Sequence, residues 1–307
     1  MTGYMHPGYV ESLIEFGTPQ ELHRCGGWIL KRQIPGSPYH DAMGCYPLFA
    51  CQDWSQLQHD LEEIRDELVC LFIVTDPFGK YDPAYLRQCF KDVVFPYKEH
   101  FITDLSYPID NIVSSKYTRK YSRKALKDLR VERCQEPIQF LDMWVALYGH
   151  LTDRHNIKGI RAFSRKAFAK QLSIPGMGMF RALHEGATVG AHLWYVIGEV
   201  GYSHLSAYSH TGYELKAAYA LQWSAIEYFA GKIRWLNQGA GTKRNGTDGL
   251  SQFKRRWSTR TRTAYFCGRI FNHVRYWEII KAKGIKDTDY FPAYREGEFR
   301  EQITKIG

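Results

Sequence analysis

The sequence predicts an α/β (α+β) protein made of two tandem units, each a mixed sheet flanked by helices. The chain has 307 residues, of which 44% are hydrophobic and 15% aromatic. That composition can bury one large core or two cores of about 150 residues each. Segments of helical and strand periodicity alternate along both halves. We therefore expect an N-terminal unit over residues 1–113 and a C-terminal unit over 114–307, with a basic linker helix at 114–134.

The first half combines an amphipathic segment with a buried strand. In residues 54–68 apolar side chains repeat at three- and four-residue steps, which predicts one face of a helix. Residues 69–75 are continuously apolar and rich in β-branched residues, as expected for a strand buried on both sides. The remainder of residues 1–50 is rich in glycine, proline and aromatics and predicts short strands and loops. The elements expected here are strands at 28–33, 69–75 and 100–105, and helices at 54–68 and 83–94.

The second half predicts three consecutive strands joined by tight turns. The turns fall at Glu185-Gly186 and Gly198-Glu199. The strands expected here are 179–184, 188–196, 201–209, 233–237 and 263–271. The helices expected are 116–129, 140–155, 165–172, 213–232, 250–257 and one that begins at His273.

Several protein classes are not expected. The seven cysteines are an odd number without a C-x-x-C pair, so we expect reduced, packed thiols in a cytoplasmic protein. The longest apolar run, residues 68–74, is far shorter than the roughly 20 residues of a spanning helix, and the N-terminus lacks the pattern of a secretory signal. Asp153 and His155 cannot share a helix face, so no metal site is expected there.

The positive charge of the chain is concentrated in two segments. The formal net charge is +9. Residues 114–134 contain eight basic and two acidic residues, and residues 243–262 contain seven basic and one acidic residue, so each segment carries +6 and the remainder carries −3. Such stripes attract phosphates of a nucleic acid, a nucleotide-linked substrate or coenzyme A. The alternative is a solvated helix face that only keeps the protein soluble.

Three segments resemble the FemAB-type branch of the GNAT-like acyltransferase superfamily. They are the basic helix SSKYTRKYSRKALK, the strand and helix YSHLSAYSHTGYELKAAYALQWSAIEYFAGK, and the strand, loop and helix WLNQGAGTKRNGTDGLSQFKRRW. Together they cover about residues 114–271. The resemblance implies two tandem GNAT-like halves and transfer of an acyl group to an amine. The chain lacks the Q/R-x-x-G-x-G/A loop of ordinary GNAT enzymes, because residues 210–215 contain one glycine. FemAB-type proteins share that departure, and some use aminoacyl-tRNA.

Acyl transfer to an amine sets three requirements. The enzyme must align both reactants, stabilise an oxyanion and accept a proton. Strict alternation along residues 201–210 would place Tyr202, His204, Ser206, Tyr208 and His210 on one unusually polar face. We expect His204 and Tyr208 to be the catalytic candidates, and Ser206 and His210 to bind the acceptor. The alternative is an exposed strand edge or a set of cross-strand aromatic pairs.

Further substrate-binding residues are expected around the glycine-rich loop at 239–249. Asn237 ends the preceding strand, and Lys254 corresponds, in the resemblance, to the lysine of the family's "FK" turn. Backbone N–H groups of the loop can cradle a phosphate. The residues expected to bind the donor or its phosphates are Tyr213, Lys216, Lys243, Arg244, Arg119 and Arg123. A flexible connection and surface lysines are the alternatives.

The sequence thus predicts a cytoplasmic acyltransferase that acts on an amine of a sugar or cell-envelope precursor. The expected donor is acyl-CoA or acyl carrier protein, and aminoacyl-tRNA is the second candidate. The acceptor is a small molecule or is linked to a lipid or nucleotide, and no metal cofactor is expected. An inactive GNAT-like module and a nucleic-acid-binding protein are the remaining alternatives. The sequence does not indicate an oligomeric state.

Overall fold

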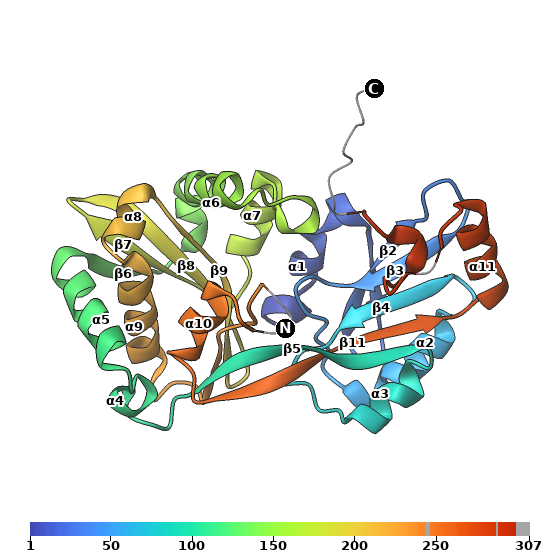
Figure 1. The fold of residues 1–307 in the computed structure, drawn as a ribbon, viewed down its shortest axis with the longest axis horizontal. Coiled ribbons are helices and arrows are strands. Elements are labelled where there is room, and N and C mark those ends of the chain that lie inside the picture. The colour runs from blue at the N-terminus through green and yellow to red at the C-terminus, as the bar shows by residue number, and fades with distance from the viewer. Residues whose placement is uncertain (243–245, 287, 299–307) are drawn as a thin grey trace. The chain divides into compact units, whose positions relative to one another are not determined.

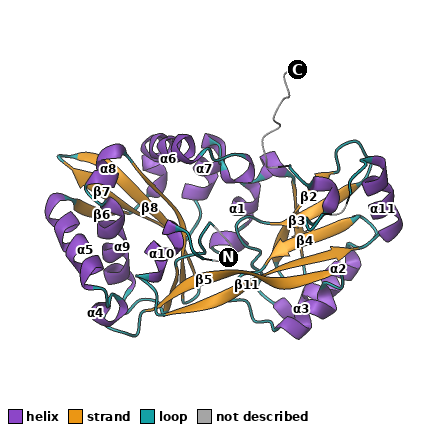
Figure 2. Ribbon diagram, in the orientation of Figure 1, coloured by secondary structure: helices purple, strands orange, loops and turns teal. Residues whose placement is uncertain are grey.

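The structure, a computed structural model, describes residues 1–242, 246–286 and 288–298 (Figures 1 and 2). The chain forms two compact units that interleave along the sequence. The first contains residues 1–12, 98–157 and 162–264, and the second contains 13–97, 158–161 and 265–307. Strands β5 (Val93–Asp104) and β11 (Arg260–Ile270) each have residues in both units. The expected boundary between residues 113 and 114 remains a prediction.

A mixed sheet forms the centre of the first unit, with the strand order β11-β5-β10-β9-β8-β7-β6. Most neighbours are antiparallel, whereas β9 and β10 are parallel. The turn at Glu185-Gly186 places both residues at positive φ, which matches the tight hairpin expected there. The strands not yet given are β6 (Arg130–Cys134), β7 (Met177–His184), β8 (Ala187–Ile197), β9 (Val200–Tyr208) and β10 (Trp235–Asn237).

Helices cover both faces of this sheet (Figure 1). On one face, α9 (Ala217–Phe229) packs on the strands through contacts such as Phe229 with Trp194, and α5 (Lys116–Asp128) packs on α9. On the other face lie α1 (Pro7–Glu11), α6 (Leu141–His155) and α7 (Arg165–Leu172), packed around Tyr195. Three short helices complete the unit, namely α4 (Ile109–Ile112), α8 (His210–Glu214) and α10 (Gly249–Arg255).

The second unit is also a mixed sheet flanked by helices. Its strand order is β1-β2-β3-β4-β11, in which β3 and β4 are parallel. Helices α2 and α3 pack with the strands in one apolar cluster, and α11 packs in another. The elements are β1 (Thr18–Leu22), β2 (Gly27–Gln33), β3 (His40–Gly44), β4 (Cys70–Val74), α2 (Leu57–Glu63), α3 (Pro83–Cys89) and α11 (His273–Ala282).

The fold class is confirmed, since both units are mixed sheets flanked by helices. The helix expected at 83–94 is too long, because β-branched Val93 and Val94 already belong to β5. The helix expected at 213–232 is wrong as a single element. Lys216, at φ +60°, separates α8 from α9. Strand β6 within the basic segment, and the short elements α1, β1 and β3, lack a strong periodic signal and were not placed individually.

All seven cysteines are free and buried, which confirms the expectation of packed thiols. The described part of the chain contains no helix long and apolar enough to span a membrane. Likewise, no three His, Cys, Asp or Glu residues among residues 1–242, 246–286 and 288–298 are grouped so as to hold a metal ion.

Candidate active site

The candidate active site lies where β9 and β10 of the first unit diverge. The parallel pairing covers only Trp235–Val200, Leu236–Gly201 and Asn237–Tyr202. Beyond Tyr202, β9 continues to Tyr208 while β10 has ended. Past this point β10 no longer pairs with the backbone groups of β9. This opening is hereafter called the strand opening.

Asn237 and His100 form the end of β10. The Asn237 Oδ1 atom accepts the Gly239 N–H at 2.9 Å and lies 3.0 Å from Nδ1 of His100. Because that amide oxygen only accepts, Nδ1 carries the hydrogen and Nε2 carries the lone pair. Burial lowers the pKa of His100 to about 4, so the ring is neutral near pH 7. His100 therefore holds the turn that ends the strand.

Lys254, on α10, reaches this turn. Its Nζ donates a hydrogen bond to the Ala240 carbonyl at 2.8 Å. A Cβ placed on Gly239, which has φ +75°, would lie 3.0 Å from Nζ, so glycine provides both the turn and the space. Burial, and then the charge of Lys98, lower the pKa of Lys254 to about 8. Lys254 is thus a partly buried cation whose pKa lies below that of an exposed lysine.

His192 on β8 adds a second neutral imidazole. Its Nε2 lies 2.8 Å from Oγ of Ser203, and its ring centroid lies 4.5 Å from that of Trp194. Burial, and then the charge of Lys254, lower the pKa of His192 to about 3. The charge of Lys254 also lowers the pKa of His100, so one cation influences both rings. His192 and His100 were not identified from the sequence, where each is a single histidine within a strand-like run.

A cavity of about 430 Å³ adjoins this group. It includes Ala240, the acceptor of the Lys254 hydrogen bond. Its charged lining side chains are the cations Lys98, Arg255 and Arg260 and the carboxylate Glu99, so the net charge of the lining is positive. Gly241 is required here, because a Cβ at this position would meet Oγ of Ser251 at 1.8 Å. The cavity therefore combines backbone groups with positive charge, which is the chemistry that binds phosphate.

The segment that contains most of these residues matches a known protein family. The family model described as an acetyltransferase (GNAT) domain matches residues 114–265. Residues 114–265 form a GNAT domain. This GNAT domain contains Lys254, Asn237 and His192, whereas His100 precedes it.

Solved structures share the fold of the whole chain. FemX is 14% identical, covers 89% of this chain and 93% of its own, and has a TM-score of 0.66. The C-terminal domain of a putative lysylphosphatidylglycerol synthetase from Agrobacterium fabrum is 12% identical, covers 91% and 93%, and has a TM-score of 0.61. L-PGS from Bacillus licheniformis is 15% identical, covers 93% and 98%, and has a TM-score of 0.60. No curated protein sequence matches the chain.

The resemblance to GNAT-like acyltransferases is confirmed over residues 114–265, and with it the prediction of an acyltransferase. The fold is shared with FemX, with the putative lysylphosphatidylglycerol synthetase domain and with L-PGS. At these low identities the solved structures show the fold alone, so donor and acceptor require separate arguments.

The expected alternation along β9 of the GNAT domain is wrong because the strand contains a β-bulge. Trp194 pairs with Ser203, whereas Leu193 pairs with Leu205, so one residue of β9 is extra. A bulge moves the following side chains to the other face. His204 therefore lies on the face of Tyr195, while Ser206 pairs with His192 on the face of Trp194.

His204 is held within the packing of the α1 and α7 face. Its Nδ1 lies 3.2 Å from the Tyr4 hydroxyl, and its Nε2 lies 3.2 Å from Oε1 of Gln171. Burial lowers the pKa of His204 to about 3. Its contacts are those of a neutral core residue on the face of the sheet opposite Trp194, and its predicted catalytic role remains a prediction.

Tyr208 and Tyr213 lie together at the far end of β9. Their ring centroids are 5.3 Å apart, and the guanidinium carbon of Arg154 lies 4.2 Å above the Tyr213 ring. Burial raises the pKa of Tyr208 to about 12, so its hydroxyl stays protonated and can donate. His210 is exposed, 3.5 Å from a Glu214 oxygen.

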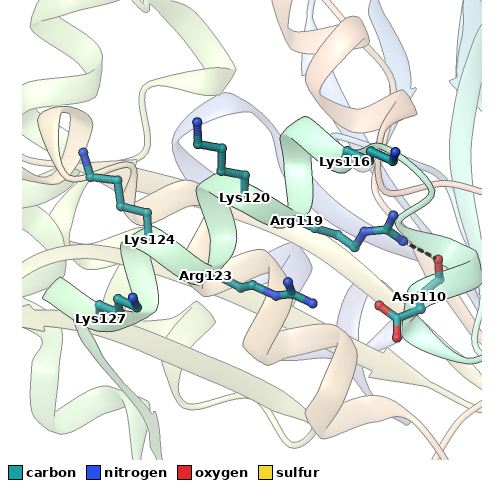
Figure 3. A pocket seen from close by; sticks show the side chains of 7 residues that line it. All are labelled: Asp110, Lys116, Arg119, Lys120, Arg123, Lys124 and Lys127. Atoms are coloured by element: carbon teal, nitrogen blue, oxygen red, sulfur yellow. Dashed lines mark hydrogen bonds between the residues drawn. The ribbon is translucent and has the colours of Figure 1, made fainter.

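The remaining donor-binding candidates lie in three places. Lys216 is exposed at the start of α9. Lys243 and Arg244 lie outside the described residues. Arg119 and Arg123 line a second cavity, of about 680 Å³, along α5 (Figure 3). Among the described residues, none lines both this cavity and the one beside Lys254. The structure thus brings Asn237 and Lys254 together and assigns the α5 residues to a separate surface.

Proposed function

We propose that this chain transfers an acyl group from a phosphate-bearing donor to a primary amine, with Lys254 at the reaction centre. The observation that carries the proposal is one cation, with a pKa of about 8, next to the strand opening and two neutral histidines. A charge in such a site interacts more strongly with a developing charge on the substrate than it would in water, because fewer water molecules screen it. The family match supports this reaction class.

The reaction balances without a covalent enzyme intermediate. The amine nitrogen attacks the carbonyl carbon of the thioester or ester, and the new C–N bond forms as the C–S or C–O bond breaks. The leaving sulfur or oxygen takes up a proton, and the amine releases one to solvent or to a base. Near pH 7 most Lys254 side chains are protonated, and Nζ retains two further hydrogens to donate to the developing oxyanion. Asn237 and His100 keep the turn beneath Lys254 in place.

Acyl-CoA, or the related acyl carrier protein, is the first candidate donor. The phosphates of this donor would lie in the cavity beside Lys98, Arg255 and Arg260. Ala240 both lines this cavity and accepts the Lys254 hydrogen bond, so the acyl end of the donor would lie beside Lys254. Fixed cations and backbone N–H groups bind such phosphates without a metal ion. Lys243 and Arg244, outside the described residues, belong to the same loop and to the same proposal.

Aminoacyl-tRNA is the second candidate, supported by the turn after β9. There the chain forms α8, and Gly212 packs so closely that a Cβ would lie 2.0 Å from the Val189 carbonyl. Such packing leaves little space for a diphosphate at the position of the ordinary GNAT loop. In this second reading, Arg119 and Arg123 on α5 would contact the RNA backbone.

The proposed acceptor is an amine on a sugar or cell-envelope precursor, free or linked to a nucleotide or lipid. The names of the fold relatives support an envelope or lipid acceptor, since two are lysylphosphatidylglycerol synthetase and L-PGS. A cytoplasmic location belongs to the same proposal.

A ligand panel tests the donor. The melting temperature of wild-type protein and Lys254→Met is measured with acetyl-CoA, longer acyl-CoAs and a stable amide analogue of an aminoacyl-RNA minihelix. Stabilisation of wild type by an acyl-CoA, reduced in the variant, supports the first candidate. Stabilisation by the minihelix alone favours the second. Mass spectrometry then follows acyl transfer from the stabilising donor to amino sugars and peptides. No stabilisation and no transfer would indicate an inactive module and overturn the proposal.

A further inference from the structure

Helix α5 presents a continuous cationic surface. Its six basic residues are Lys116, Arg119, Lys120, Arg123, Lys124 and Lys127. At 3.6 residues per turn they span an arc of about 140°, opposite the buried side of the helix. That buried side is formed by Thr118, Ser122 and Ala125. Figure 3 shows the six side chains projecting from the helix. The set is called the α5 arc below.

The α5 arc has an excess of positive charge, since Asp110 is the one carboxylate among the described residues that line its cavity. Across the residues that the structure describes, none of the six forms an ion pair with a carboxylate, and Arg119 donates only to the backbone carbonyl of Asp110 at 3.2 Å. Six like charges over a helix of about 20 Å repel one another. A partner of high negative charge density would relieve this repulsion.

The side chains of the α5 arc can recognise negative charge but not the identity of a base. It contains no amide, hydroxyl or aromatic side chain that could recognise a base or a 2′-hydroxyl. The neighbouring tyrosines are engaged, since the Tyr117 and Tyr121 ring centroids are 4.2 Å apart and Tyr121 lies 5.7 Å from Tyr219. The Arg256 guanidinium carbon lies 5.4 Å from the Tyr117 ring centroid. Base stacking, the usual supplement to charge in single-stranded RNA binding, is therefore not provided here.

We infer that the α5 arc docks the protein on an anionic lipid bilayer. A single straight helix can present all six cations to a flat surface at once, and each contributes to attraction by acidic headgroups. The α5 arc is distinct from the proposed reaction site beside Lys254, and it has no other assigned role when acyl-CoA is the donor.

Vesicle co-sedimentation tests the inference with the full-length protein and no substrate. Vesicles of phosphatidylcholine with roughly one-third phosphatidylglycerol are compared with pure phosphatidylcholine vesicles, in about 0.1 M salt. The test variant is Lys120→Gln/Arg123→Gln/Lys127→Gln, at the centre of the arc. The control variant removes the same charge from exposed lysines elsewhere, as Lys80→Gln/Lys166→Gln/Lys281→Gln. Circular dichroism checks that both variants are folded.

Wild type and control should bind the acidic vesicles at least about tenfold more tightly than the neutral ones, and the α5 variant should lose at least about tenfold in affinity. Equal binding by the two variants would overturn the inference. So would a protein that binds a 20-base-pair RNA duplex through the same three residues and does not bind the acidic vesicles, because the arc would then be an RNA surface.

Discussion

Replacing Lys254 with methionine should separate the contribution of this lysine to acyl transfer from its effect on the free energy of unfolding. The side chain is partly buried, and burial lowers the pKa of its ammonium to about 8. A lysine whose pKa is lower in the folded state than in the unfolded chain destabilises the fold below pH 8, where it is charged in both states. That penalty disappears as the pH rises from 8 to 10.5. Methionine keeps the volume of the stem and removes the charge.

The size of the effect follows from the pKa change. A fall in the pKa from 10.5 to about 8 corresponds to at most about 3.4 kcal/mol, and the remaining exposure of the side chain reduces this to about 1.5 kcal/mol. The lost hydrogen bond to Ala240 costs about 1 kcal/mol at every pH. Methionine should therefore be slightly stabilising at pH 7 and destabilising by about 1 kcal/mol near pH 10. Acyl transfer should fall about 10²-fold.

Urea unfolding, followed by tryptophan fluorescence at pH 7 and pH 10, measures this difference for wild type, Lys254→Met and the exposed control Lys166→Met. The predicted result is a pH-dependent difference for Lys254→Met and none for Lys166→Met. If the stability difference of Lys254→Met were the same at both pH values, the pKa of Lys254 would not be lowered and the electrostatic reasoning would be refuted.

Further predictions concern the residues around this lysine. Gly239→Ala should lower activity and cost about 1–2 kcal/mol of stability in urea unfolding, because residue 239 is at φ +75° and lies close to Nζ; wild-type activity would contradict this. The pH profile of kcat/KM should fall as the pH rises through about 8 and show no histidine inflection between pH 5.5 and 7.5, since burial holds the pKa of His100 near 4 and of His192 near 3. For the same reason, stability should be complete above pH 6.5 and decrease as the pH falls toward 4, measurable as the melting temperature against pH. His204→Phe should lower the melting temperature and leave kcat/KM of the folded protein within about threefold; a much larger loss of kcat/KM would restore His204 as a catalytic residue.

The fold was largely predictable because its elements have strong periodicity. The amphipathic pattern of α6 and the hairpin turn at Glu185-Gly186 are local signals, and both appear where expected. The division of one long apolar helix into α8 and α9 was not predictable, because it depends on Lys216 taking a left-handed conformation that glycine usually adopts.

The candidate site was predictable only in part. Asn237 was found because it ends the strand before the glycine-rich loop, and Lys254 was found through the resemblance to the family's "FK" turn. His100 joins Asn237 through a contact across 137 positions of sequence. The β-bulge in β9 carries no sequence signal, yet it reverses which face Ser206 and Tyr208 occupy relative to His204. The position of His100 beside Asn237 and the bulge in β9 both depend on contacts between distant segments, which the local sequence does not show.

The central claim is that the acyl carbonyl is held at Lys254 in the strand opening. A crystal structure with a stable thioether analogue of acetyl-CoA tests this most directly. The carbonyl oxygen should lie within about 3.5 Å of Nζ, and the phosphates should lie beside Lys98, Arg255 and Arg260. An analogue bound with its carbonyl against His204, or at α8 and away from Lys254, would contradict it.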